Sequence, residues 1–560
     1  MFEVINLTSF FVGHSLGMVK PVLIIIIFVL LSVGVTPFIG NITKRPELTS
    51  LFFLLKISLL YTVSKAAINQ RFEAFRIGVY TPSKLEFTHT TQIGLLFDQT
   101  SAPFFFTTLF IGLMSIFFTH YYMWGEVHAS RFSRLLLLFL FSMLLLLTSD
   151  NLITLFLGWE LIGLYSFLLI NFWVTKTTAL KSAFKALLYN QLSDAALLGF
   201  IVVTFLQTKQ CAITSNDLNL HDTNSHLAAM CLIVCAGCKS AQAPFHYWLP
   251  DSMEAPIPAS ALIHSATLVS AGVFLVIRLW EVHQLPPLFS QLLVYMSVIT
   301  IVCGGVGAAA QSDLKKTLAY STISNCGFMM LFGVLNSKSL CFFYFLFHGI
   351  FKALSFLLVG AIVLIMGHKQ DWRYNNLNSC SRHSLLAGLS ITILLLGAWP
   401  LFTNNFIKHI NLSSLTTPST LVYTQAFVFA GTLLGSLMSL VYSAQILTNL
   451  YSTTNIKAQP TGLQSQGGLQ IPKQLISYVV GAASAVTLYN IYTTLVVPTE
   501  GLVDSTFNSY ITTSAPATQP MWDIPLLVVA AFLLLQRFWS VSSGTNFLVL
   551  AWVLVGCVAA

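Results

Sequence analysis

A glutamate and a lysine stand inside long apolar runs of the sequence, where an ionised side chain is costly. Glu160 follows the apolar run 152–159, and Lys239 lies among small residues that allow close helix contact. Ionisable groups inside hydrocarbon are costly unless paired or hydrated, so each is a candidate functional residue. Burial drives a lone lysine toward its neutral form, whereas a nearby carboxylate holds it charged. A Glu–Lys pair whose partners move together or apart is therefore a proton switch, and Glu160 and Lys239 are the candidates for it.

A second group of ionisable residues could pass a proton onward. His264 and His348 fall within apolar runs, and imidazole both accepts and donates a proton near neutral pH. Lys352 lies four residues beyond His348 and so shares its helix face. Lys408 lies near the end of a helix that Pro400 interrupts. The structural alternatives are a packed histidine, a carboxylate that braces a neighbouring helix, and a lysine that extends its ammonium to the membrane surface.

The elements that position these residues follow from composition. Of 560 residues, 56% are hydrophobic and only 8% are charged, and the mean hydropathy is +0.78. A soluble protein carries roughly 25% charged residues, so lipid must be the outer solvent of this chain. About 15 or 16 apolar stretches reach the roughly 20 residues that cross a bilayer as a helix. Their apolar runs are continuous, not alternating, which excludes a barrel and predicts an all-α polytopic membrane protein.

Two of the predicted helices carry a proline beside their polar positions. Pro244 follows Lys239, and Pro400 precedes Lys408. Proline removes a backbone donor and interrupts a helix. Paired, interrupted helices are typical of inverted-repeat transporters, whose ion sites lie at mid-membrane.

The sequence carries no signal for several other classes of function. The net charge of +8 is modest, and the basic residues sit in short connections without interleaved aromatics, which indicates membrane orientation and no nucleic-acid partner. Of the nine cysteines, Cys231, Cys235 and Cys238 lie near one helix face, but no histidine or carboxylate accompanies them at metal-ligand spacing. We therefore expect no metal site and no cofactor-binding residue in this chain.

Four blocks of the sequence resemble one known family. Residues 158–173, which begin Gly-Trp-Glu-Leu-Ile-Gly, resemble the fifth-helix motif of NADH:ubiquinone oxidoreductase chain 5, an antiporter-like membrane-arm subunit of respiratory complex I. Residues 239–267, with His-Tyr-Trp-Leu-Pro-Asp-Ser-Met-Glu-Ala-Pro inside them, match more closely, and 313–322 and 348–354 match as well. The related fourth chain differs after its Leu-Pro. The resemblance covers residues 90–450, and its central block is the most specific part.

The resemblance implies a role for each member of the first group. Glu160 would pair with Lys239, whose charge state would be coupled to neighbouring subunits. Asp194 matches a family carboxylate near the entry path of the lysine. The family sequence Asn-Arg-Val-Gly-Asp reads Asn-Gln-Leu-Ser-Asp here, so Gln191 replaces a basic residue.

The resemblance also orders the second group. His264, His348 and Lys352 would lie on a hydrated central axis, and Lys408 would serve the exit side. A histidine expected four residues before His348 is Tyr344, and the Ser-Lys-Asp around the last lysine reads Ile-Lys-His. These departures leave the Glu–Lys pair intact and fall farther along the axis.

The function implied is that of a proton-translocating subunit of mitochondrial complex I, with no redox chemistry in this chain. FMN, iron–sulfur clusters and ubiquinone would belong to other subunits. Expected partners are a chain 4-like neighbour, other membrane-arm and supernumerary subunits, and membrane lipid, with cardiolipin at basic interfacial pockets. The expected location is the mitochondrial inner membrane, the alternatives being a bacterial plasma membrane or a plastid membrane. Two other functions stay open: a component of a multi-subunit cation/proton antiporter, and a non-pumping structural subunit.

The resemblance divides the chain into N-terminal transmembrane helices (1–125), an antiporter-like proton-translocating core (126–450) and C-terminal helices (451–560). Family members usually carry a long lateral amphipathic helix near the C-terminus. Here residues 541–560, nearly all apolar, follow the candidate span 523–540. A helix of about 20 residues reaches only about 30 Å. We therefore expect the lateral helix to be missing, shortened or supplied by another chain.

Overall fold

The computed structural model describes most of the central part of the chain. The described residues are 75–79, 93–97, 100–208, 213, 223–283, 287–335, 338–365, 389, 393 and 422–451. Lys408, the interruption at Pro400 and the segment expected to lack a lateral helix lie outside these residues.

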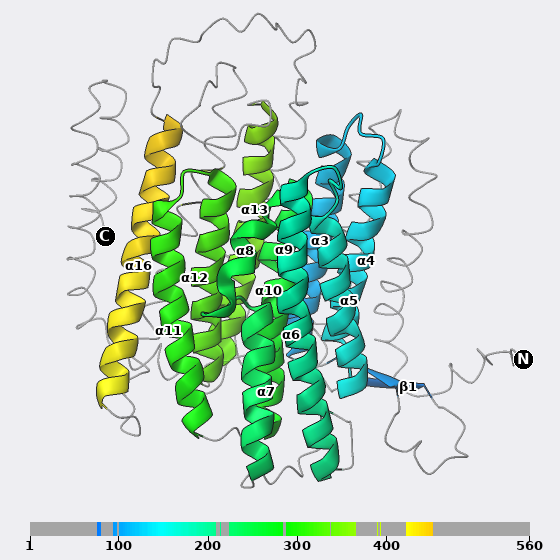
Figure 1. Cartoon of the computed structure of the whole chain (residues 1–560), viewed down its shortest axis with the longest axis vertical. Coiled ribbons are helices and arrows are strands. Elements are labelled where there is room, and N and C mark those ends of the chain that lie inside the picture. The colour runs from blue at the N-terminus through cyan, green and yellow to red at the C-terminus, as the bar shows by residue number, and fades with distance from the viewer. Residues whose placement is uncertain are drawn as a thin grey trace, which may run out of the picture.

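Helices make up nearly all of the described structure (Figure 1). The order is β1 (Phe75–Val79), β2 (Ile93–Phe97), α3 (Ser101–Tyr122), α4 (Ala129–Leu147), α5 (Leu152–Ile170), α6 (Thr177–Thr208), α7 (Thr223–Lys239), η3 (Phe245–Tyr247), α8 (Trp248–Asp251), η4 (Ser252–Glu254), α9 (Ile257–Ser265), α10 (Leu268–His283), α11 (Pro287–Ala310), α12 (Leu314–Val334), α13 (Lys338–Ile365) and α16 (Val422–Tyr451).

The helices form a membrane bundle, as the apolar runs predicted. Within the described residues, seven helical segments are long and apolar enough to cross a membrane, and two shorter apolar helices, Phe104–Thr119 and His226–Lys239, accompany them. Large apolar side chains such as Leu157, Leu188 and Leu206 are exposed on α5 and α6. In a soluble protein such a surface would be an anomaly, but in a membrane it is the surface that meets lipid or a partner. The all-α membrane class is confirmed.

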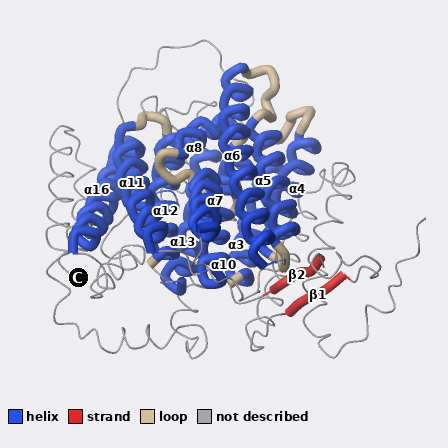
Figure 2. Tube along the Cα trace, turned by 60° about the horizontal axis from the view of Figure 1, so that its bottom comes forward, coloured by secondary structure: helices blue, strands red, loops and turns tan. Residues whose placement is uncertain are grey.

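The described residues also include one small β-hairpin. Strands β1 and β2 pair antiparallel with Phe75 opposite Phe97 (Figure 2). Both lie in the stretch between predicted helices, so the helix pattern held no signal for them. The backbone N–H of Leu96 donates to the carbonyl of Thr148 at 2.8 Å, which ties the hairpin to the turn between α4 and α5.

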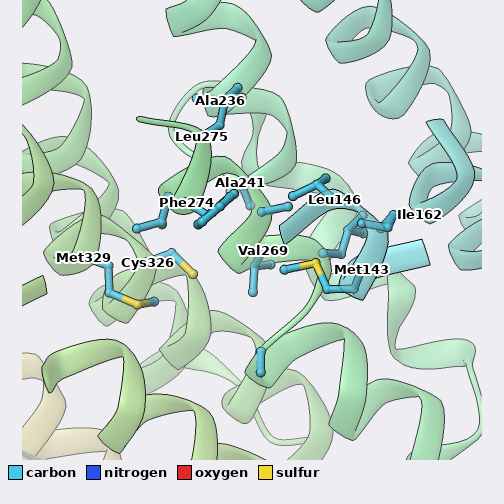
Figure 3. Packing of buried hydrophobic residues seen from close by; sticks show 14 of the residues in the cluster. Met143, Leu146, Ile162, Ala236, Ala241, Val269, Phe274, Leu275, Cys326 and Met329 are labelled. Carbon is cyan, nitrogen blue, oxygen red and sulfur yellow. The ribbon is translucent and has the colours of Figure 1, made fainter. Parts of the chain in front are cut away.

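The centre of the bundle is the pair α9 and α10. Every residue of the segment Ile257–Leu279 is buried. Val269 and Phe274 of α10 meet Met143 of α4 and Met329 of α12 in one apolar cluster (Figure 3). Around this pair the other helices stand side by side, with α16 and α11 at one edge and α4 and α5 toward the other (Figure 1).

Two interruptions shape the interior. Helix α7 ends at Lys239, and short turns carry the chain past Pro244 to the start of α9, as the proline predicted. A second break separates α9 from α10 at Ala266 and Thr267, where the Thr267 hydroxyl donates to the Leu262 carbonyl at 2.8 Å. The sequence holds no proline there, and residues 256–280 read as one continuous span. Both breaks leave polar backbone inside the bundle, where protein surrounds it and lipid does not.

Candidate functional site

Lys239 is fully enclosed at the end of α7. Only 1% of its surface is exposed, and its Nζ donates to the carbonyl oxygen of Trp159 on α5 at 3.0 Å. The same Nζ lies 3.6 Å from Oδ1 of Asp194 on α6 and 5.1 Å from the centre of the Trp159 ring. Gly163 leaves the space that this ammonium needs, because a Cβ there would lie 3.2 Å from Nζ. Three helices therefore build one cation site around the lysine.

Hydrogen bonds between the helices fix the walls of this site. The indole N–H of Trp159 donates to Ser193 Oγ at 3.2 Å, and Ser193 donates to the carbonyl of Cys235 at 3.0 Å. The amide of Asn190 donates to Ser166 Oγ at 3.2 Å. Asn190, Ser193 and Asp194 all lie on the inner side of α6, where they are buried. The polar groups that hold α5, α6 and α7 together thus also orient the groups that face Lys239.

Glu160 does not pair with Lys239 in the structure, contrary to the pairing that the resemblance implied. Trp159 points into the bundle, and the next residue of a helix lies about 100° further around the axis. Glu160 accordingly lies on the exposed side of α5. The buried lysine pairs with Asp194 instead. From the exposed side of α5, Glu160 still acts electrostatically on Asp194.

His264 lies in the last turn of α9 with no exposed surface. Its Nε2 is 3.0 Å from Ser252 Oγ, and Ser252 donates its hydrogen to the carbonyl of Leu249 at 2.6 Å. Because a hydroxyl has one hydrogen, this arrangement makes His264 Nε2 the donor. Its Nδ1 then carries a free lone pair, and it has no partner among the described residues. The break between α9 and α10 therefore presents an imidazole acceptor inside the bundle.

Lys352 lies on α13 close to His264. It has no exposed surface, and its Nζ donates to Ser321 Oγ of α12. Both His264 and the Lys352 ammonium face the ring of Phe356, at 5.5 Å and 5.8 Å from its centre. Lys352 and His348 both act electrostatically on His264. The structure therefore brings together the three residues assigned to a central axis.

Tyr344, His348 and Lys352 follow one another at intervals of four residues and are all buried. This confirms the shared helix face that the spacing predicted. The Tyr344 hydroxyl donates to Oδ1 of Asn325 on α12 at 2.6 Å. The position at which the resemblance expects a histidine thus holds a hydroxyl that bonds α12 to α13.

Gln242 occupies the chain break between Lys239 and the helix that carries His264. It has no exposed surface; its Oε1 accepts from the Thr300 hydroxyl of α11 at 2.8 Å, and its Nε2 donates to the carbonyl of Ser240 at 3.3 Å. Sequence reasoning did not select Gln242 or Thr300. The position of Gln242 between Lys239 and His264, beside a helix break, was the available signal, and Thr300 carried none.

Charged residues tie the interrupted segment to its neighbours at one end of the bundle. Lys185 of α6 pairs with Asp251 at 2.6 Å, and the Thr178 hydroxyl donates to Glu254 at 3.4 Å. At the start of α12, outside the seven candidate spans, burial lowers the pKa of Lys315 to about 8, while Glu254 acts in the opposite direction. These contacts hold the turn that carries Ser252 and so fix the partner of His264.

No group of three or more histidines, cysteines or carboxylates that could hold a metal ion occurs among the described residues. Cys235 and Cys238 are buried in α7 beside the lysine site. Their backbone carbonyls accept hydrogen bonds from Ser193 Oγ and from the indole N–H of Trp248, each at 3.0 Å.

Comparison with known proteins points to the same class of membrane protein as the fold does. A model of the transmembrane region shared by NADH:quinone oxidoreductases and Mrp antiporters matches residues 149–435, which include α5 to α13. The fold and the buried charges define an antiporter-like membrane subunit. The chain belongs to the NADH:quinone oxidoreductase/Mrp antiporter family.

Curated relatives bear out the resemblance to chain 5. The chain is 39% identical to NADH-ubiquinone oxidoreductase chain 5 of Paramecium tetraurelia over 364 residues, which cover 62% of this chain and 63% of that protein. It is 33% identical to chain 5 of Petromyzon marinus over 408 residues, with 70% of this chain and 67% of that protein covered. The chain thus spans slightly less than two thirds of the Paramecium protein.

Two solved structures share the fold. A chain of the membrane-bound sulfane sulfur reductase, an archaeal respiratory membrane complex, superposes with a TM-score of 0.67 at 17% identity, covering 84% of this chain and 94% of that chain. A chain of the Mrp complex from Dietzia sp. superposes with a TM-score of 0.64 at 20% identity, covering 93% of this chain and 63% of that chain. Both neighbours are parts of multi-subunit membrane complexes.

Proposed function

We propose that the chain is a proton-translocating membrane-arm subunit of a mitochondrial NADH:ubiquinone oxidoreductase, complex I. The observation that carries the proposal is the buried ammonium of Lys239, held between a backbone carbonyl and the carboxylate of Asp194. A charge enclosed by three membrane helices is costly, and a packing role does not require one. A non-pumping structural subunit would have no use for it.

The separation of Lys239 and Asp194 suits a switch. Their closest atoms are 3.6 Å apart, whereas a charge-assisted hydrogen bond measures about 2.7–2.9 Å. A small helix shift could therefore tighten the pair or draw it apart. When Asp194 is near and ionised, it holds the lysine charged. When it withdraws or takes up a proton, burial drives Lys239 to release its own.

Glu160 would be the input to this switch. Its negative charge repels a second negative charge on Asp194, so its protonation state changes how readily Asp194 pairs with the lysine. Because Glu160 lies on the exposed face of α5, a neighbouring subunit that packs there can set its charge. The chain 4-like neighbour is the partner we propose for this face.

The proton released by Lys239 would move toward the second group of ionisable residues. Gln242, held by Thr300, lies in the chain break that leads from Lys239 to α9. His264 offers Nδ1 as an acceptor, and Lys352 lies beside it. Lys408 would serve the exit side, as the resemblance implies. Direct transfer along this route requires water or hydroxyl groups between the ionisable side chains.

The driving reaction would take place in other subunits. FMN, iron–sulfur clusters and ubiquinone would be held there, and this chain would contribute to the enzyme only by moving protons. Its location would be the mitochondrial inner membrane, with membrane-arm and supernumerary subunits and cardiolipin as partners.

One alternative function draws on the same observations. A component of a multi-subunit cation/proton antiporter would use the same fold, which the Mrp neighbour shares. Purification of the native complex separates the two. We expect the chain to co-purify with flavin and iron–sulfur subunits, and the reconstituted complex to acidify vesicles when NADH reduces quinone. A complex without those subunits that exchanges protons for sodium ions would establish the alternative.

A substitution at Gly163 tests whether proton translocation depends on the space around the Lys239 ammonium. A Cβ there would lie 3.2 Å from Lys239 Nζ and 3.5 Å from Asn190 Cβ. Overpacking typically costs about 1–3 kcal/mol, so we expect Gly163→Ala to displace the ammonium and lower proton translocation per NADH oxidised by about threefold or more. Gly333→Ala is the control, because its Cβ would meet Ile277 at an ordinary 3.6 Å. Equal translocation in the two variants would contradict the proposed site.

A further inference from the structure

The hydroxyl group of Ser252 lies between a backbone carbonyl and the imidazole of His264. Its Oγ is 2.6 Å from the carbonyl oxygen of Leu249 and 3.0 Å from Nε2 of His264, and none of the three residues has exposed surface. Two oxygens approach to 2.6 Å with a hydrogen between them, and the serine hydroxyl has one hydrogen to place there. Ser252 therefore donates to Leu249 and accepts from His264.

This hydrogen bond fixes the tautomer of the neutral imidazole. A neutral imidazole carries one N–H and one lone pair on its two nitrogens. An N–H at Nε2 of His264 leaves the lone pair at Nδ1, which has no hydrogen-bond partner among the described residues. On the Nε2 side the hydrogen bonds end at a backbone carbonyl, which does not take up a proton. Nδ1 is thus the atom of this ring that can accept one.

The short turns that carry Ser252 are anchored to the end of α7. Trp248 has no exposed surface, and its indole N–H donates to the carbonyl of Cys238 at 3.0 Å. Within the turn, the backbone N–H of Ala255 donates to the carbonyl of Ser252 at 3.2 Å. Because Cys238 directly precedes Lys239, the position of the serine is tied to the helix end that carries the buried lysine.

We propose that Ser252 is a positioning residue for His264: it holds Nε2 as the donor, so that the imidazole takes up and releases its proton at Nδ1 alone. On uptake, the Nδ1 lone pair forms a new N–H bond and the ring becomes an imidazolium. On release the same bond breaks, and Nε2 keeps its hydrogen throughout. This inference rests on the proposed proton-translocating function.

Exchange at one atom has a consequence for the direction of transfer. A proton does not pass through the ring of His264 from one nitrogen to the other, so it leaves on the side on which it arrived. Direction must then come from a change in the groups around the imidazole between uptake and release. Lys352 and His348 of α13 are the ionisable groups whose charges act on it.

The first test removes the hydroxyl group of Ser252 from the intact complex. In Ser252→Ala the neutral imidazole can carry its hydrogen on either nitrogen, and only one of these forms accepts a proton at Nδ1. We expect proton translocation per NADH oxidised to fall about 2- to 10-fold, the range of one buried hydrogen bond.

Ser142→Ala is the matched control for this variant. Ser142 of α4 also has no exposed surface, and it donates to the carbonyl of Phe139, three residues earlier, at 2.7 Å. Each variant loses the same kind of local hydrogen bond, so their thermal stabilities should fall alike, whereas only Ser252→Ala should lose translocation. Wild-type translocation in Ser252→Ala, or an equal loss in the two variants, would overturn the inference.

A second pair of variants separates the hydrogen bond of Ser252 from its packing. Ser252→Thr keeps a hydroxyl group and should translocate protons at nearly the wild-type level. Ser252→Cys fills a similar volume, but a thiol is a weak donor and a weak acceptor, so most of the loss should remain. Translocation in Ser252→Cys equal to or above that in Ser252→Thr would overturn the inference, even if Ser252→Ala does not assemble. Failure of the wild-type complex to translocate protons at all would instead refute the proposed function.

Discussion

Replacement of Lys239 by methionine is expected to lower NADH-driven proton translocation by about tenfold or more, since each 1.4 kcal/mol of added barrier costs about a factor of ten. Methionine fills a similar volume without the ammonium, so Asp194 loses the only ion-pair partner that it has among the described residues. The measurement is acidification of vesicles per NADH oxidised, with the amount of assembled complex determined in parallel. Wild-type translocation in Lys239→Met would remove the lysine from the proposed route.

The control for this variant is Lys316→Met. Lys316 pairs with Asp313 at 3.7 Å on the surface, with 44% of its side chain exposed. Exposed ion pairs contribute only about 0–1 kcal/mol, so this variant should keep wild-type translocation and stability.

A double variant separates catalysis from stability. Removal of one partner from a buried ion pair typically costs about 3–5 kcal/mol, because the other charge stays buried and unpaired. In Lys239→Met/Asp194→Asn neither charge remains, so we expect thermal stability to recover toward the wild-type value. Translocation should stay at the level of the single variant. Recovery of translocation along with stability would show that the lysine only holds the helices together.

The sequence predicted the helices and one break because their causes are local. Apolar runs of membrane length must become helices in lipid, and Pro244 removes a backbone donor at a defined point. The break at Ala266 and Thr267 has no such local cause. It depends on the Thr267 hydroxyl bonding back to Leu262 and on the enclosure of the whole segment by other helices. A continuous apolar run carries no trace of this tertiary effect.

The sequence drew attention to ionisable residues that the structure buries, but it did not predict which of them pair. An ionisable residue is easy to recognise in an apolar helix, which is why Lys239, His264 and Lys352 could be selected. The helix that carries Glu160 is apolar on all sides, so the sequence does not reveal which side faces inward. The orientation becomes visible only through the inward Trp159, whose carbonyl receives the lysine.

The second prediction with a large expected effect distinguishes Asp194 from Glu160. The sequence does not show which of these two carboxylates pairs with Lys239. Asp194→Asn leaves the ammonium of Lys239 with the carbonyl and the ring of Trp159, and without a carboxylate. We expect this variant to lose about 3–5 kcal/mol of stability, measured as a lower thermal transition of the detergent-solubilised complex, and to lose translocation as well.

Glu160→Gln is the matched comparison, since it also replaces a carboxylate by an isosteric amide. Glu160 is exposed on α5 and makes no ion pair within the described residues. Its replacement should change stability by no more than about 0.5 kcal/mol, while translocation falls because the input to Asp194 is lost. If the two variants lost equal stability, Glu160 would hold the lysine as much as Asp194 does. The contact at 3.6 Å would then represent only one position of a pair that rearranges.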